Sequence, residues 1–174
     1  MAWEDHRKNL PRGLRFLIIV TSDTILSKSR RGEKFQDASG DIAESLVRGA
    51  GHNVVGRVYL PNDVESIRDG VKSAVIGGSA DVVVVSGGTG LGPKDITVEA
   101  ISPLMERTIP GFGELFRRLS FETVGTAAIA SRATAGASNG VLIFALPGAP
   151  DAVMLALDRI IMPEAPHLVK MIRG

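Results

Sequence analysis

Three apolar runs of strand length constrain the fold of this chain more than any other feature. Residues 14–21 (LRFLIIVT), 81–86 (DVVVVS) and 141–146 (VLIFAL) are dominated by β-branched and aliphatic side chains. A strand with one face in water alternates apolar and polar residues, whereas a continuous apolar run is typical of a strand buried on both faces. The chain is therefore expected to bury both faces of a sheet.

The segments between the first two runs have the pattern of crossover helices. Residues 37–50 place apolar side chains on one helical face and are followed by Gly51, a common helix stop. Residues 54–60 are expected to form another strand, and residues 64–75 carry valine and isoleucine at helical spacing. The charged residues 28–34 are expected to form a loop. This order of strands and helices predicts a parallel sheet.

The second half of the chain is expected to continue this alternation. We predict helices near residues 97–107, 111–121, 150–161 and 163–173, and a strand over residues 126–133. Pro103 and Pro163 are expected to mark kinks or breaks, because proline lacks the amide hydrogen that an interior helical turn requires.

Length and composition favour a single domain. The chain has 174 residues, of which 44% are hydrophobic and 22% are charged. This is enough for one compact core and too little for two ordinary domains. We therefore expect an N-terminal tail over residues 1–13 and one domain over residues 14–174.

Charge and residue types argue against several classes of function. Lysine plus arginine number 20 against 19 aspartate plus glutamate, a net charge of +1 that does not favour nucleic acid or membrane as partners. The chain has no cysteine, and His6, His52 and His167 are too scattered for a metal cluster or a nucleophile relay. The polar start of the chain lacks a signal-peptide core, and no apolar run is long enough to span a bilayer, so we expect a cytoplasmic location.

A glycine-rich segment over residues 86–97 (SGGTGLGPKDIT) directly follows the second apolar run. Its glycines permit positive φ and a close approach of backbone amides to phosphate oxygens. Lys94 can neutralise phosphate and Asp95 can offer oxygen to Mg²⁺. The alternative is a tight turn in which Asp95 or Thr97 caps the next helix. The candidates for phosphate binding are Gly87, Gly88, Thr89, Gly90, Gly92 and Lys94.

Several loops that follow strands are expected to meet this segment. In open parallel α/β sheets, ligands bind outside the carboxyl ends of the strands, near the point where the strand order reverses. The loops concerned lie at residues 22–37, 61–63, 87–97 and 147–150. They are expected to converge on one cleft.

Four motifs together resemble the MogA/MoaB family of molybdopterin-binding proteins, most closely its MoaB branch. They are residues 86–97, 110–117 (PGFGELFR), 131–136 (SRATAG) and 146–150 (LPGAP), in the family's order. The resemblance implies an α/β fold, a three-layer α/β/α sandwich with a mostly parallel central sheet. In active members it also implies condensation of molybdopterin with Mg-ATP, which gives adenylylated molybdopterin and pyrophosphate.

The resemblance also implies partners. The substrates would be ATP and molybdopterin with Mg²⁺ as cofactor, and a downstream enzyme would insert molybdate, or tungstate in some organisms. The family forms homotrimers, which MoaB-type members can pair into homohexamers. Trp3 in the tail and Phe16 beyond it are candidates for such contacts, although Trp3 is equally open to terminal disorder.

The resemblance assigns the catalytic and metal-binding roles to carboxylates. Asp95 matches the aspartate that closes the family's glycine motif. A second essential aspartate is usual after the second strand, where this chain has Asn62 followed by Asp63. Asn62 could bind metal through its carbonyl, or Asp63 could supply the charge. Asn62 followed by Glu65 also resembles a helix capping box.

Further positions match the family's molybdopterin site. These are Ser22, Asp23, Glu114, Ser131, Arg132 and Gly148. Structural alternatives stay open for them: a local turn for Ser22 and Asp23, an ion pair between Glu114 and Arg117, and a satisfied strand end for Ser131. Asp37 also matches a family aspartate, but a helix cap explains it better.

Two rival functions remain at this stage. Asn62, in the place of a usual carboxylate, leaves open a protein that binds molybdopterin without catalysing adenylylation. An NAD-dependent oxidoreductase is disfavoured, because the first strand is followed by residues 21–24 (TSDT) and by no glycine fingerprint.

Overall fold

The structure, a computed structural model, describes residues 9–174, and a six-stranded sheet lies at its centre. Trp3, His6 and most of the expected tail fall outside the described residues. The strands are β1 (Arg15–Thr21), β2 (Asn53–Leu60), β3 (Val82–Ser86), β4 (Arg107–Thr108), β5 (Thr134–Ser138) and β6 (Val141–Leu146). Their spatial order is β2-β1-β3-β6-β5-β4; the first four are mutually parallel, and β5 is antiparallel to both neighbours.

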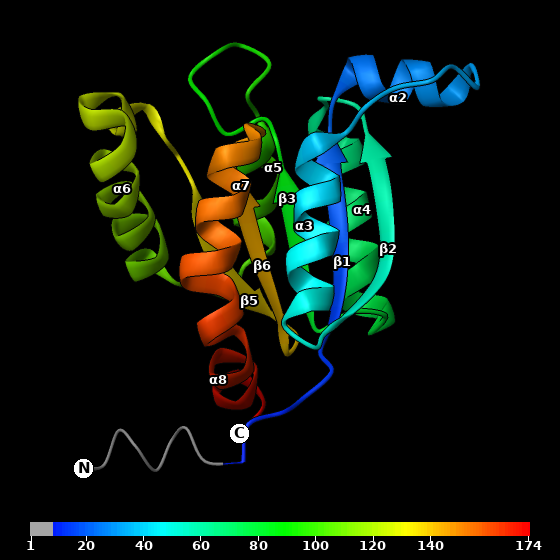
Figure 1. The fold of residues 1–174 in the computed structure, drawn as a ribbon. Helices are drawn as coiled ribbons and strands as arrows, with labels where there is room; N and C mark the ends of the chain where they lie inside the picture. The colour runs from blue at the N-terminus through cyan, green and yellow to red at the C-terminus, as the bar shows by residue number, and fades with distance from the viewer. Residues whose placement is uncertain (1–8) are drawn as a thin grey trace.

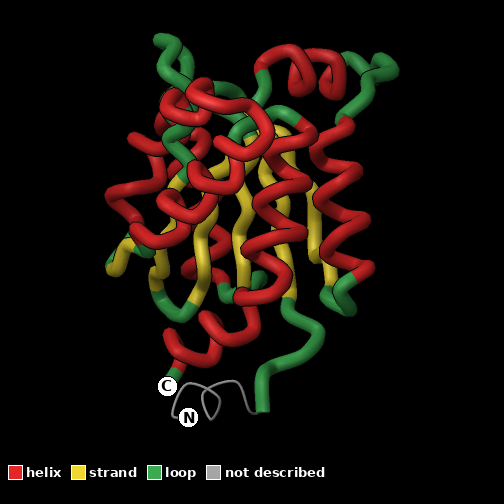
Figure 2. Tube along the Cα trace, turned by 60° about the vertical axis from the view of Figure 1, so that its left-hand side comes forward, coloured by secondary structure: helices red, strands yellow, loops and turns green. Residues whose placement is uncertain are grey.

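Helices cover both faces of this sheet (Figures 1 and 2). They are α2 (Asp23–Arg30), α3 (Ala38–Gly49), α4 (Val64–Gly77), α5 (Thr97–Ile101), α6 (Pro110–Val124), α7 (Pro150–Ala156) and α8 (Met162–Arg173), with 3₁₀ segments η1 (Ser102–Leu104) and η2 (Gly125–Ala130) and a π-helical turn η3 (Leu157–Ile161). The predicted three-layer α/β/α sandwich with a mostly parallel sheet is confirmed.

Two apolar cores lie on the two faces of the sheet. Ile18 and Val84 point into the core under α3, α6 and α7, whereas Ile19 and Val83 point into the core under α4 and α5. Neighbouring residues along β1 and β3 are therefore both buried, as the continuous apolar runs predicted. Phe16 is fully buried in the first core, so it is not available for a contact between subunits.

The strand order reverses beside β1. The chain crosses from β1 through α3 to β2 on one side, and then returns through α4 to β3 on the other side. In open α/β sheets, ligands bind beyond the carboxyl ends of the strands at such a reversal, which here are β1 and β3. Figure 1 shows α2 and the green loop that follows β3 rising above this edge.

The strand predicted over residues 126–133 is wrong. Residues Gly125–Ala130 form η2, and the strand begins only at Thr134. The true strand, TAGAS, is made of small residues because neighbouring segments pack closely on it: a Cβ atom at Gly136 would lie 2.5 Å from the sulfur of Met105 and 2.7 Å from the carbonyl oxygen of Arg107. Small residues have little strand propensity, which hid the element.

Three other boundaries differ from expectation. The loop predicted over residues 28–34 overlaps the end of α2, a short helix in which no residue is fully buried. The helix expected over residues 97–107 ends at Ile101, and the break expected at Pro103 is confirmed by η1. The chain stays helical through Pro163, with the π-helical turn η3 immediately before it, so this proline does not break the helix.

An ion-pair network joins three elements at the amino ends of the strands. The Asp81 carboxylate accepts hydrogen bonds from the Arg15 backbone amide at 2.7 Å, from Arg15 Nη2 at 2.9 Å and from Arg173 Nη2 at 2.8 Å. Burial alone would raise the pKa of Asp81, but these hydrogen bonds outweigh it and hold the pKa well below its usual range. The network ties β1 and β3 to the C-terminal helix.

We expect Asp81→Asn to lower the free energy of unfolding by about 1–3 kcal/mol, because it removes the charge that two arginines and one amide bind. The folded-state pKa of Asp81 is depressed, so this contribution is complete at neutral pH and disappears as the pH falls below about 4. Urea denaturation of wild type and Asp81→Asn, at neutral pH and again well below about pH 4, measures the difference. The exposed Asp69→Asn on α4 is the control, and equal stability of Asp81→Asn and wild type at pH 7 would contradict the prediction.

Candidate functional site

The loops expected to converge do meet at the carboxyl edge of the sheet. The Ser22 amide donates to the Leu60 carbonyl at 3.0 Å, and the Gly87 amide donates to the Leu146 carbonyl at 3.0 Å. A Cβ atom at Gly148 would lie 3.3 Å from the Gly87 Cα atom. The segments that follow β1, β2, β3 and β6 are therefore within contact distance of one another.

The first half of the glycine loop has a backbone that only glycine adopts easily. Gly87 and Gly88 have φ angles of 103° and 67°. A Cβ atom at Gly87 would lie 2.6 Å from the Thr21 carbonyl oxygen. Thr97 holds this half in place, since its hydroxyl donates to the Gly87 carbonyl at 2.8 Å and its amide donates to the Gly88 carbonyl at 2.9 Å.

The second half of the loop folds back on Asp95. The carboxylate Oδ2 atom of Asp95 accepts the Gly92 amide at 2.8 Å, and the Asp95 amide donates to the Gly92 carbonyl at 2.9 Å. The first residue before α5 is Ile96, and no side chain caps the helix. The alternative in which Asp95 or Thr97 caps α5 is therefore wrong.

Arg132 joins this loop to the segment before β5. Its Nε atom donates to the Gly90 carbonyl at 2.8 Å, and its Nη2 atom donates to the Asp95 carbonyl at 2.6 Å. The guanidinium also pairs with Glu99 on α5, and the hydrogen bond from Arg132 lowers the pKa of the Glu99 carboxylate. Arg132 thus contacts the loop from outside and does not line the cavity described next.

A cavity of about 350 Å³ lies between the glycine loop and the loops that precede β5 and follow β6. Its wall is made by Gly88, Thr89, Gly90, Asp95, Ala130, Ser131, Pro147 and Gly148. The structure thus brings the predicted residues Asp95, Ser131 and Gly148 together. A second hollow of about 510 Å³ shares Ser131 and Pro147 with it and runs between α6 and α7, where its lining is mostly apolar.

A polar cluster lies on the other side of the loop. The Asp23 carboxylate accepts the Asn62 amide at 2.9 Å and pairs with Lys94 Nζ at 3.4 Å. The hydrogen bond from the Asn62 backbone amide lowers the pKa of Asp23 most, and Lys94 lowers it further. Asp63 caps α4 by accepting the Ser66 amide at 2.7 Å, which lowers the pKa of Asp63. The alternative in which Asn62 caps α4 is therefore wrong, since the cap is the next residue, Asp63.

Other predicted positions have structural partners. Ser22 caps α2 by accepting the Ile25 amide at 3.2 Å. Asp37 caps α3, as expected, by accepting the Gly40 amide at 2.9 Å.

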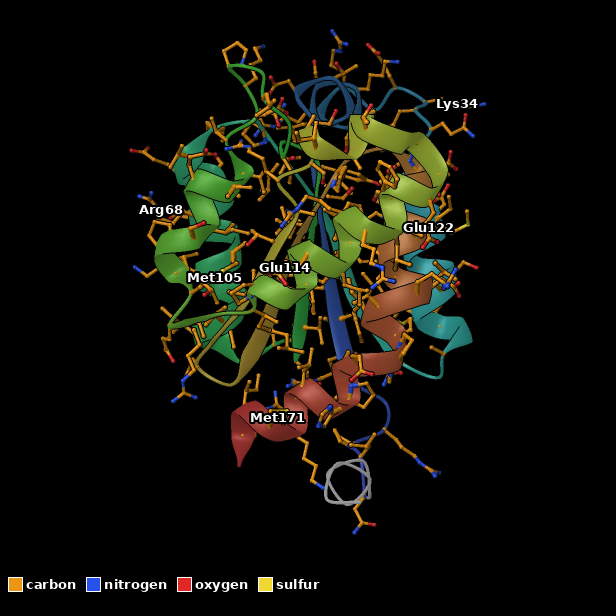
Figure 3. The ribbon with its side chains drawn as sticks, turned by 90° about the vertical axis from the view of Figure 1, so that its left-hand side faces the viewer. Lys34, Arg68, Met105, Glu114, Glu122 and Met171 are labelled. Carbon is orange, nitrogen blue, oxygen red and sulfur yellow. The ribbon has the colours of Figure 1, made fainter. Side chains whose placement is uncertain are left out.

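Two residues of α6 differ from expectation. Glu114 is exposed in the first turns of α6, where Figure 3 shows it well below the glycine loop, and it does not line the cavity. Arg117 does not pair with Glu114; it donates to the carbonyls of Ser131 and Ala133.

Sequence reasoning missed three polar side chains near the cavity. The Ser39 hydroxyl donates to the Gly148 carbonyl at 2.7 Å and so fixes the bend after β6. The hydroxyl of Ser86 is buried at the end of β3 without a hydrogen-bond partner in the described structure. Glu99 carries no local signal in the sequence, because it is an exposed glutamate in a helix. Ser86 belongs to the glycine motif, which offered a signal.

The acidic residues do not form a closed metal site. Among residues 9–174, no group of three or more histidine, aspartate or glutamate side chains is placed to hold a metal ion. Magnesium is commonly bound by one or two carboxylates together with substrate phosphates and water. The carboxylate of Asp95, beside the loop, fits that mode. None of the described helices is long and apolar enough to cross a membrane.

Comparisons with known proteins point to one family. Residues 17–167 match the family model described as "Probable molybdopterin binding domain". The chain is 36% identical to molybdenum cofactor biosynthesis protein B of Bacillus subtilis (strain 168), over 99% of this chain and 98% of that protein. It is 40% identical to the protein of the same name in Escherichia coli (strain K12), over 84% and 86%. The crystal structure of the tungsten cofactor synthesizing protein MoaB from Pyrococcus furiosus superposes with a TM-score of 0.82 at 37% identity, over 94% of this chain and 99% of that one.

We expect Gly88→Ala to lower the free energy of unfolding by about 1–3 kcal/mol, because alanine is strained at positive φ and its Cβ atom would meet the Thr97 hydroxyl. The matched control is Gly77→Ala at the end of α4, where a Cβ atom has open space and is expected to be neutral or stabilising by up to about 1 kcal/mol. Urea denaturation of the three proteins compares them. A Gly88→Ala variant as stable as wild type would show that the loop does not need this backbone.

Proposed function

This chain belongs to the MogA/MoaB family of molybdopterin-binding proteins, on its MoaB branch, and from that premise we propose that it adenylylates molybdopterin with Mg-ATP. The carrying observation is the cavity in which the glycine loop and the Asp95 carboxylate face Ser131 and Gly148. It joins a backbone suited to phosphates with a carboxylate suited to a divalent cation.

The reaction needs alignment more than covalent help from side chains. An oxygen of the terminal phosphate of molybdopterin attacks the α-phosphorus of ATP, and a new phosphorus–oxygen bond forms. The bond from the α-phosphorus to the bridging oxygen breaks, and pyrophosphate leaves with the electron pair. Loop amides and Lys94 bind the charged oxygens and hold the two substrates in line, which lowers the entropic cost of the encounter.

The carboxylate of Asp95 is proposed to hold the metal beside the loop. Bound Mg²⁺ would supply charge neutralisation for the triphosphate and its leaving group. The Asp95 Oδ2 atom accepts the Gly92 amide, so the carboxylate is oriented by the loop that it serves. Asp63 is proposed as the second carboxylate for the metal, although in this structure its carboxylate caps α4 by accepting the Ser66 amide.

The mostly apolar hollow between α6 and α7 suits a planar ring system, either the pterin of molybdopterin or the adenine of ATP. It shares Ser131 and Pro147 with the cavity at the glycine loop, so a ligand with its phosphates at the loop can extend into it. Apolar and aromatic lining is typical of pockets that bind planar organic groups. The adenylylated product would then pass to a partner enzyme that inserts the metal.

A second candidate function is binding of molybdopterin without catalysis. The observation that favours it is Asn62 in the position of a usual carboxylate, together with the use of the neighbouring Asp63 as a helix cap. Both functions require the same cavity. They differ in whether pyrophosphate is formed.

The test is pyrophosphate release from ATP, Mg²⁺ and molybdopterin, measured for wild type and for Asp95→Asn. Asparagine keeps the shape and can still accept the Gly92 amide, but it lacks the negative charge that binds the cation. We expect turnover to fall by two or more orders of magnitude, or at least about 2.7 kcal/mol of transition-state stabilisation. Thermal stability and molybdopterin binding should stay near wild type.

The exposed Asp69→Asn on α4 serves as the matched control and should turn over normally. Near-normal pyrophosphate release by Asp95→Asn would remove Asp95 from the mechanism. A wild-type protein that binds molybdopterin but releases no pyrophosphate with Mg²⁺ would favour the binding function and point to Asn62 as the cause.

We also propose that the protein is a homo-oligomer, a trimer or a hexamer. Apolar side chains are exposed on α6 and η2, where Phe121, Val124 and Ile129 are 57%, 56% and 87% exposed. Burial of such a surface against a second copy would remove it from water. Light scattering at micromolar concentration should give a mass three or six times the chain mass of 18.4 kDa. A monomer mass would refute the proposal.

A further inference from the structure

We propose that Glu99 is a positioning residue: it orients the Arg132 guanidinium, which in turn holds the glycine loop in the geometry that the reaction needs. This inference rests on the proposed adenylylation for its catalytic consequence. The other part of the inference, that Glu99 and Arg132 order the loop, can be measured without turnover. Neither role follows from the motif, which made Arg132 a candidate for direct contact with molybdopterin.

The Arg132 guanidinium is the main external support of the loop. It donates to the carbonyls of Gly90 and Asp95 at 2.8 and 2.6 Å, and more weakly to that of Thr89 at 3.4 Å. These carbonyls lie on both sides of the loop tip. A planar guanidinium has donors in a fixed fork, so one side chain can fix two separated points of backbone at once.

The tip has two internal hydrogen bonds, between Gly92 and Asp95, and little other support from outside the loop. Leu91 is 75% exposed, and the residues from it to Lys94 are all exposed. The remaining side-chain link to the rest of the described chain is the pair between Lys94 and Asp23, whose side chains are 80% and 46% exposed. Such an exposed pair restrains the chain weakly. Arg132 is therefore the main support that the tip receives from outside the loop.

Glu99 fixes the direction in which Arg132 points. Both of its carboxylate oxygens accept from the guanidinium, from the Nη1 and Nη2 atoms. Glu99 lies in the first turn of α5, directly after the loop, so the loop and the residue that orients its support move as one unit. The pair leaves Nε and the second Nη2 hydrogen directed at the loop carbonyls.

The consequence concerns Asp95. Its carbonyl is bound by Arg132, and its carboxylate lines the cavity. If the guanidinium turns away, the Asp95 carbonyl loses its partner, while the side chain stays chemically intact and the amide keeps only its bond within the loop, to Gly92. Loss of Glu99 should therefore reduce the catalytic rate more than it weakens the binding of molybdopterin, because alignment and not contact is lost.

The experiment compares Glu99→Gln, Arg132→Lys and the double variant with wild type in two assays. Hydrogen–deuterium exchange of the ligand-free protein should show amides of residues 87–96 exchanging about tenfold faster in each single variant, with α4 amides unchanged. Pyrophosphate release should show kcat reduced about tenfold, with the KM for molybdopterin within about twofold of wild type. Because Glu99 acts through Arg132, the double variant should be no worse than Arg132→Lys.

Glu106→Gln is the matched control, since Glu106 accepts from Ser138 and Asn139 at the opposite edge of the sheet. It should leave both loop exchange and kcat unchanged. Unchanged loop exchange in Glu99→Gln, or effects that multiply in the double variant, would overturn the inference. If wild type released no pyrophosphate, the adenylylation proposal would fail, and loop exchange would still decide whether Glu99 and Arg132 order the loop.

Discussion

Burial of β1 and β3 on both faces is the constraint on which the rest of the structure depends. Consecutive side chains such as Ile18 and Ile19 enter opposite cores, so each face of the sheet needs its own helical cover. The helix that connects β1 to β2, α3, therefore lies on one face of the sheet, and the helix that connects β2 to β3, α4, lies on the other. Because they diverge, the carboxyl ends of β1 and β3 are covered by loops, and the glycine loop after β3 forms one wall of the cavity, opposite the loop after β6. The site is thus a result of how the core is covered.

Close packing, as well as ligand chemistry, explains why glycine occurs in the loop after β3. Gly87 approaches the Thr21 carbonyl, and Cβ atoms at Gly90 and Gly92 would lie 2.6 and 2.9 Å from the Asp95 carboxylate. A glycine count alone therefore does not distinguish a phosphate site from a close-packed turn. What favours the phosphate site is the position of Asp95: its carboxylate closes the loop and lines the cavity, whereas a helix cap would have turned it away.

The sequence predicted what local patterns encode and missed what distant contacts decide. Continuous apolar runs located β1, β3 and β6, and helical spacing located α3 and α4. The strand β5 was missed because its small residues are required by Met105, in another segment. The motifs identified Arg132 as a site residue, but its bonds to Gly90 and Asp95 span 42 and 37 positions of chain and cannot be read locally. The sequence offered Asn62 as the cap of α4, and only the structure shows that Asp63 caps it.

Charge neutralisation at the cavity has to be local, because a net charge of +1 gives no long-range field to concentrate the two anionic substrates of the proposed reaction. Arg132 is bound by Glu99 and loop carbonyls, so it fixes geometry and has little freedom to follow a ligand. Lys94 differs: it is 80% exposed, and its partner Asp23 is 46% exposed. An exposed pair of this kind contributes little to stability, so a phosphate can take Lys94 from Asp23 at small cost. The loop therefore has two cations with different functions: Arg132, bound to loop carbonyls, maintains its shape, and the exposed Lys94 is available to a phosphate.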